Sequence, residues 1–298
     1  MLATQVIFAT LPIAIKLVLP VVEPLGIVAI RIGGAAALFA AVKWNRTRQR
    51  VAPGDLLRFA GLALLGVVLN QILFLEGVRR TTAVHTNILI TTIPVFTLGV
   101  ALLLRRERAS AAKLTGIALA GAGAAYLALS HGGAAEGASA QGDLLVAANS
   151  LCYASYLVLS KDLLRRYAPM TVVTWVFLIG AVLIAPLGVP ALLRVNADAV
   201  STRTVLVLVY IVVFPSFLTY LLSIWALRHT ASSLVAMYVY VQPVVTAFLA
   251  PLILGETVTP RIGLASVLIF AGLALSTWGE QVTGGQLGRA FRPPAEGA

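Results

Sequence analysis

Ten apolar runs follow one another along the chain, and only short polar gaps separate them. The runs lie near residues 2–20, 24–43, 57–76, 82–104, 111–129, 143–160, 169–192, 203–226, 231–254 and 261–278. A bilayer core is about 30 Å thick and needs about 20 apolar residues per helix, so each run is long enough to cross a membrane. Charged residues make up only 11% of the chain, against roughly 25% in soluble domains. The sequence therefore predicts an all-α integral membrane protein with ten transmembrane helices.

The net charge of +11 would suggest a nucleic-acid partner in a soluble chain. Here the basic residues lie in the short gaps, and no basic helix carries interleaved aromatic residues, so we predict contact with membrane lipid and no nucleic acid. Most Lys and Arg of the gaps lie in the even-numbered ones and in the C-terminal tail. The positive-inside rule then places both termini in the cytoplasm.

The second half of the chain repeats the first. At a constant offset of 149 residues the matched pairs are Pro94 with Pro243, Thr97 with Thr246, Glu107 with Glu256, and Gly66 with Pro215. Each half holds five runs, and an odd number of crossings makes the second half enter from the opposite side. We therefore predict two inverted five-helix repeats, residues 1–130 and 143–278, followed by a cytoplasmic tail at 279–298.

Small residues gather in several of the runs. The motifs are GGAAA at 33–37, GLALLG at 61–66 and GAGAA at 121–125. Small side chains allow helix backbones to approach closely, which matters because lipid provides no hydrophobic drive for helices to associate. These motifs predict close helix packing, although Gly and Ala are also simply common in membrane spans.

Two matched prolines, Pro94 and Pro243, lie inside apolar runs that otherwise predict continuous helices. A proline in a helix interior removes one backbone hydrogen bond and costs roughly 3 kcal/mol. The carbonyl that it frees must meet protein or cavity water, so the kinks should face the interior of the bundle. We predict that these prolines, with Pro215 and Gly66 in another matched pair of runs, shape a cavity or gate; the alternative is that they only set helix bends.

Polar side chains gather at similar depth in the predicted spans. Asn87, Thr91 and Pro94 follow one another at spacings of four and three, and therefore share one helix face. Any single Tyr or Thr could instead bond a neighbouring helix. The polar candidates for substrate binding are Asn70, Gln71, Asn87, Thr91, Tyr153, Tyr220, Tyr238 and Gln242.

Two basic residues, Lys16 and Arg31, fall in the outer third of their spans, and Glu23 and Glu76 lie near the same face. Charges inside a membrane are costly, so they mark either function or a necessary partner. One interpretation is that Lys16 and Arg31 extend to the interface and pair locally. The other is that one of them attracts a carboxylate or phosphate of the substrate, and we count both as candidates.

The acidic residues lie in gaps or at span ends, and none falls at a predicted midplane. Sodium- and proton-coupled carriers commonly place an ionisable group there, which favours facilitated or exchange transport. His85 could relay protons, or it is a packed polar group near the outer end of its span. We expect Glu107 and Glu256 to be structural and to pair with basic neighbours such as Arg105 or Arg261. Cys152 is the single cysteine, and we predict neither a metal nor a cofactor.

The chain resembles the EamA-like branch of the drug/metabolite transporter (DMT) superfamily. The resemblance rests on ten spans in two halves, on the Pro94 and Pro243 helices that Glu107 and Glu256 follow, and on Pro24, which six residues separate from Arg31. It implies a ten-helix inverted-repeat exporter or facilitator of small metabolites, commonly amino acids or related compounds, in a bacterial inner membrane. Glu76 departs from the family pattern, which more often has a small residue there.

Several functions remain to be distinguished. A secondary transporter that works by alternating access is the first hypothesis, and a proton-coupled exporter of drugs or amphiphiles is its alternative. A channel would pass substrate without saturation or exchange. A membrane enzyme would need a compact set such as H-E-x-x-H, which the sequence lacks. We therefore predict a non-enzymatic protein, monomer or homodimer, whose partner is a small molecule; amino acids, nucleosides and amphiphilic drugs fit equally.

Overall fold

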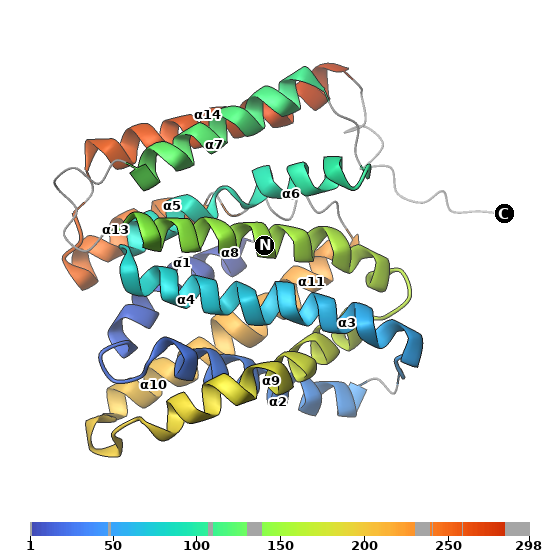
Figure 1. Ribbon diagram of the computed structural model, residues 1–298, viewed down its shortest axis with the longest axis vertical. Helices are drawn as coiled ribbons and strands as arrows, with labels where there is room; N and C mark the ends of the chain where they lie inside the picture. Colours follow the sequence, from blue (N-terminus) through green and yellow to red (C-terminus); the bar gives the residue numbers. More distant parts are fainter. Residues whose placement is uncertain are drawn as a thin grey trace.

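The computed structural model describes residues 2–46, 49–106, 110–129, 139–229, 239, 241–257 and 259–283, and all regular elements in these ranges are helical (Figure 1). The elements of the first half are α1 (Leu2–Val18), α2 (Pro24–Arg46), η1 (Pro53–Asp55), α3 (Leu56–Ala63), η2 (Leu64–Leu69), α4 (Asn70–Arg80), α5 (Ala83–Ile90), α6 (Ile93–Leu103) and α7 (Ala111–Leu129). Those of the second half are α8 (Ala140–Leu164), α9 (Pro169–Leu193), η3 (Ala197–Ala199), α10 (Thr202–Ile211), η4 (Val212–Leu218), α11 (Thr219–His229), α13 (Val241–Leu254) and α14 (Pro260–Thr283).

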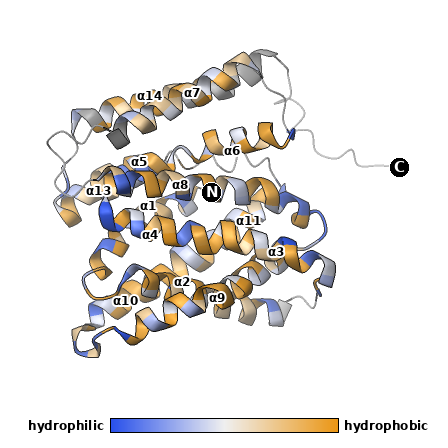
Figure 2. Ribbon diagram, in the orientation of Figure 1, coloured by the Kyte–Doolittle hydropathy of each residue, from blue (hydrophilic) through white to orange (hydrophobic). Residues whose placement is uncertain are grey.

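Six helical stretches of the described residues are long and apolar enough to cross a membrane, and shorter apolar helices accompany them. Figure 2 shows apolar residues along most of the helices, with hydrophilic residues gathered mainly near helix ends and loops. The structure therefore confirms the predicted all-α membrane fold. The number of ten crossings and the division into inverted repeats stay predictions, because the chain is not described between residues 230 and 238.

Two long stretches contain a π-helical segment at matching places. η2 interrupts Pro53–Arg80 and contains Gly66, whereas η4 interrupts Thr202–His229 and contains Pro215. A π turn is wider than an α turn and occurs often at functional sites. Pro215 has no N–H to donate and its ring would collide with a carbonyl of a regular α turn, so the wider turn accommodates it.

The predicted span that contains Pro94 is broken. α5 ends at Ile90, Thr91 and Thr92 form a turn, and α6 begins at Ile93. The hydroxyl of Thr91 donates to the Ile88 carbonyl at 2.5 Å. Pro94 therefore lies in the first turn of α6, where a missing N–H costs no helix hydrogen bond, and not in a helix interior as the sequence suggested.

Helices of the two halves pack directly on each other. α2 lies along α9, α4 along α8, and α1 along α13. α7 and α14 form a pair at one side of the bundle, at the top of Figure 1. Gly272 of α14 faces the backbone of Gly116 and Ala120, and this close approach leaves no room for a side chain there.

The small-residue motifs contribute to packing through some of their glycines. A Cβ on Gly34 would meet Val212, and one on Gly123 would meet Leu268 and Ile269. By contrast, Gly33, Gly61 and Gly121 have no such neighbour. Each motif therefore presents one glycine to another helix, as close packing requires, and one glycine to open space.

Candidate functional site

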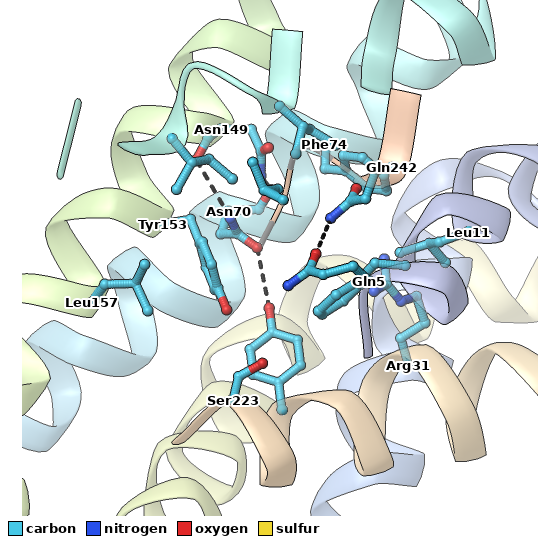
Figure 3. Close-up of a pocket in the computed structure, with 15 residues that line it drawn as sticks. Gln5, Leu11, Arg31, Asn70, Phe74, Asn149, Tyr153, Leu157, Ser223 and Gln242 are labelled. Atoms are coloured by element: carbon cyan, nitrogen blue, oxygen red, sulfur yellow. Dashed lines mark hydrogen bonds between the residues drawn. The ribbon is translucent and has the colours of Figure 1, made fainter. Parts of the chain in front are cut away.

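A pocket lies between helices of both halves of the chain (Figure 3). It contains about 690 Å³ of space between protein atoms, counting the open solvent at its edge. Its polar lining residues are Gln5, Arg31, Asn70, Asn149, Tyr153, Tyr220, Ser223 and Gln242, and its apolar ones are Phe8, Leu11, Phe74, Ile90, Ile93, Leu157 and Val239.

Asn70 and Asn149 form one wall of the pocket, where α4 meets α8. The side-chain amide of Asn149 donates to the Asn70 carbonyl at 2.8 Å, and the amide of Asn70 donates to the Asn149 carbonyl at 3.4 Å. Asn70 directly follows the π-helical segment η2. The reciprocal bonds fix the orientation of both side chains and tie the two halves together at this wall.

Tyr220 of α11 completes the same wall. Its hydroxyl donates to the Gly66 carbonyl at 3.2 Å and to the Asn70 side-chain oxygen at 3.3 Å. Its ring packs against the rings of Phe177 and Tyr153 at centroid distances of 4.9 and 6.2 Å. A carbonyl in the wide turn of η2 is thus satisfied by a hydroxyl from the other half of the chain, as buried polar groups require.

Gln5 and Gln242 form the opposite side, where α1 meets α13. The amide nitrogen of Gln242 donates to the Gln5 side-chain oxygen at 2.5 Å, and Figure 3 shows this bond beside the pocket. Both side chains are buried. The pair leaves an amide nitrogen of Gln5 and an amide oxygen of Gln242 for other partners.

Arg31 of α2 is the one charged residue among the lining residues of this pocket. Only 2% of its surface is exposed, its Nε donates to the Ser216 hydroxyl at 3.0 Å, and its Nη1 has no hydrogen-bond partner in the described structure. Its guanidinium carbon lies 6.0 Å from the centre of the Phe74 ring. Figure 3 shows the side chain pointing from α2 toward Gln5.

Lys16, the other basic candidate, lies away from the pocket lining. Its amino group is 3.6 Å from the Glu256 carboxylate, and the same carboxylate accepts the backbone N–H groups of Ala83 and Val84 at 2.7 and 3.0 Å. Glu256 therefore binds the start of α5 and Lys16. The expected pairing of Glu256 with Arg261 is not tested, because the Arg261 side chain lies outside the described part of the structure, as does Glu107.

Asp143 and His85 form a buried pair near the same end of α5. Nδ1 of His85 lies 3.0 Å from the Asp143 carboxylate, and the Thr81 hydroxyl donates to the other carboxylate oxygen. Asp143 is fully buried although it lies in the first turn of α8. Two acidic residues of the second half, Asp143 and Glu256, thus hold the start of α5.

Polar contacts also connect the helices at the other end of the bundle. The Asp55 carboxylate accepts the Tyr167 hydroxyl at 2.8 Å and lies 3.2 Å from the Arg166 guanidinium and 3.1 Å from that of Arg58. A bundle whose halves are joined by separable polar contacts at both ends, with a pocket between, can in principle open at either end.

The structure brings some predicted candidates together and leaves others apart. Asn70, Tyr153, Tyr220, Gln242 and Arg31 line the pocket. The side chain of Asn87 instead bonds Thr246 and, at 3.0 Å, the Ala9 carbonyl. Thr91 bonds its own helix, and the buried Gln71 is not among the residues that line the pocket. Tyr238 lies outside the described residues.

Ten lining residues were not among the sequence candidates for substrate binding, and three of them, Gln5, Asn149 and Ser223, are polar. Gln5 is a single amide in the first apolar run, and its isolation there was a usable signal. Phe8 and Phe74 carried no signal, because an aromatic residue in a span is most often simply apolar. They border the pocket because the helices that hold the polar candidates bring them there.

Comparison with known proteins matches the chain in two parts, one in each half. The profile of the EamA-like transporter family matches residues 1–129 and again residues 140–278. The chain belongs to the EamA-like transporter family. Members of this family are transporters with small-molecule substrates, so the protein is a multi-pass membrane transporter.

Relatives and a solved structure extend the comparison. An uncharacterized transporter of Archaeoglobus fulgidus is 30% identical, covering 92% of this chain and 94% of its own. A probable terminal-alkyne amino-acid exporter of Streptantibioticus cattleyicolor is 28% identical over 76% of this chain and 75% of its own. The WALLS ARE THIN 1 protein of Arabidopsis thaliana is 26% identical over 81% of this chain and 71% of its own. A solved crystal structure shares the fold, with a TM-score of 0.66, 18% identity and coverage of 92% of this chain and 94% of its own.

Proposed function

We propose that this protein is a secondary transporter that exports or facilitates small metabolites, such as amino acids or related compounds, across a bacterial inner membrane. The pocket is the substrate site, and the two halves alternately open it to each side. Both termini face the cytoplasm in this proposal. The observation that carries it is the wall of Asn70, Asn149 and Tyr220, because these side chains join both halves directly at the pocket.

The family supports transport, and one relative supports the substrate class. The Streptantibioticus cattleyicolor relative is described as a probable exporter of a terminal-alkyne amino acid. The amide, hydroxyl and aromatic groups of the lining suit the polar groups and the apolar side chain of an amino acid. We expect no catalytic activity.

Transport in proteoliposomes tests the proposal. We expect saturable uptake of at least one compound from a panel of radiolabelled amino acids and metabolites, and faster uptake when the same compound is present inside. Uptake that rises linearly with concentration and does not respond to internal substrate would indicate a channel and contradict the carrier.

A matched pair of variants links transport to the pocket. Tyr220→Phe removes the hydroxyl that bonds Gly66 and Asn70, so we expect lower uptake from an otherwise folded protein. Tyr126→Phe makes the same chemical change in α7, at a residue that is not among those that line the pocket, and should leave uptake unchanged. Equal uptake by all three proteins would contradict the assignment of the site.

A proton-coupled exporter is the second candidate function, and the pair of His85 and Asp143 is the observation that favours it. Histidine serves as a proton shuttle in many proteins, and this pair joins α5 of the first half to α8 of the second. If transport is coupled to protons, an imposed proton gradient should drive uptake against a concentration gradient. If the substrate only reaches equal concentrations on both sides, with or without the proton gradient, the protein is a facilitator and not a proton-coupled exporter.

A further inference from the structure

In the described part of the chain, the pocket lining contains one positively charged residue and no negatively charged one. Arg31 carries a permanent positive charge because a guanidinium does not lose its proton in proteins. No Asp or Glu is among the residues that line the pocket, and no carboxylate of the described residues forms an ion pair with Arg31. A buried charge without a counter-ion is costly, so this arrangement favours an anion that enters the pocket.

The guanidinium is also only partly bonded. Ser216 takes the Nε hydrogen, and Nη1 is buried without a partner. Ser216 lies in the π-helical segment η4, where its own hydroxyl donates to the Ile211 carbonyl at 2.8 Å. Its hydroxyl oxygen is thereby turned to accept from Arg31. The bond to Ser216 fixes one edge of the Arg31 guanidinium, and N–H donors on its other edge remain for a ligand.

The remaining lining residues define the rest of the ligand. Phe8, Phe74 and Tyr153 present aromatic rings, and Leu11, Ile90, Ile93 and Leu157 add aliphatic groups. Two of the amide oxygens are already used: the Gln5 oxygen accepts from Gln242, and the Asn70 oxygen accepts from Tyr220. A positively charged group on the ligand would meet no carboxylate among the described residues of this lining, so it would gain no ion pair there.

We infer that the pocket selects organic carboxylates, in which the carboxylate binds the free face of Arg31 and an apolar or aromatic body fills the rest. A positive charge on the ligand adds nothing to binding. An amino acid therefore binds through its carboxylate and no more tightly than the same acid without its amino group. This inference rests on the proposed transport function and narrows its substrate class.

Four compounds that share a phenylethyl group and differ in their charged groups test this inference. They are 3-phenylpropionate, phenylalanine, 3-phenylpropionamide and phenethylamine. With purified full-length protein in detergent, we expect calorimetric binding to be tightest for the acid, equal or weaker for phenylalanine, and weaker by about 10- to 100-fold for the amide and the amine, because hydrogen bonds to charged groups contribute a factor of this order.

Variants of Arg31 tie this order to one side chain. Arg31→Gln should weaken binding of the acid to about the level of the amide and weaken binding of the amide itself much less, and Arg31→Lys should restore part of the preference. Arg203→Gln is the matched control, because Arg203 is exposed at the start of α10. Circular dichroism and size-exclusion profiles of each variant would show that it is folded.

Three results would overturn the inference. They are binding of the amide or amine as tight as that of the acid, no binding of the acid at millimolar concentration, and unchanged binding of the acid by Arg31→Gln. The transport proposal is tested separately. If the wild-type protein exchanges neutral or cationic compounds through a site that depends on Tyr220, transport stands and the carboxylate preference fails.

Discussion

Glu256 joins three parts of the bundle, and its removal should loosen one end of it. Its carboxylate accepts the N–H groups of Ala83 and Val84 and lies 3.6 Å from the Lys16 amino group. The first N–H groups of a helix have no partner within the helix, and a carboxylate at this position also interacts favourably with the helix dipole. Glu256→Ala removes all of these interactions at once.

The structure sets the expected magnitude. A hydrogen bond to a charged group contributes about 1.5–3 kcal/mol, and Glu256 makes two with the start of α5. Lys16 adds at most about 1 kcal/mol, because its side chain is 23% exposed and recovers water when the pair is broken. We therefore expect Glu256→Ala to lower the free energy of unfolding by about 3–7 kcal/mol. Glu256→Gln should cost about 1–3 kcal/mol, since its amide oxygen still accepts one N–H.

Two measurements check this expectation. Unfolding by sodium dodecyl sulfate in mixed micelles gives the free energy, and hydrogen–deuterium exchange of the peptide that contains residues 81–90 reports on the start of α5. Glu76→Gln is the control, since Glu76 pairs with Arg80 of its own helix, a pair type that contributes only about 0.3–0.5 kcal/mol. If Glu256→Ala is no more costly than the control, or leaves exchange at residues 81–90 unchanged, the carboxylate does not hold α5.

Two further changes test other contacts by the same unfolding assay. Gly66→Ala would place a methyl group into the buried ring of Tyr156 and should lower the free energy of unfolding by about 1–3 kcal/mol. Gly33→Ala is the control, because its methyl group meets open space and should be neutral or stabilising. Equal losses of stability in the two variants would contradict the packing of Gly66 on Tyr156. Asp143→Asn should cost about 1–3 kcal/mol because His85 loses a charged partner, and a double-mutant cycle with His85→Gln should show coupling; strictly additive losses would mean that the two residues do not interact.

The helices could be predicted from the sequence because their signal is local. A run of about 20 apolar residues predicts a span whatever the rest of the chain does, and the stretches Pro169–Leu193 and Thr202–His229 follow such runs closely. The state of Pro94 was not predictable in this way. Whether a proline bends a continuous helix or begins a new one depends on whether the residues before it, here Thr91 and Thr92, form a turn.

The partners of polar residues could not be predicted, because they are set by helix packing and not by neighbours in the chain. Glu256 binds N–H groups more than 170 positions away, and Arg31 binds Ser216 across 185 positions. The sequence offered two roles each for Lys16 and Arg31. Only the arrangement of helices separates them, since among the described residues it gives Lys16 a carboxylate and leaves Arg31 beside the pocket without one.

The two π-helical segments each take up one residue more than an α turn would. Because the wide turn absorbs this extra residue, the helix on either side keeps nearly the rotational phase of an uninterrupted α-helix. Deleting a single residue in η2 or η4 would therefore restore regular winding and leave Asn70, or Tyr220, facing the pocket. In η2 the deletion would remove the wide turn in which the Gly66 carbonyl accepts the Tyr220 hydroxyl. A one-codon deletion would thus separate the role of the wide turn from that of the side chains beside it, which no single substitution can do.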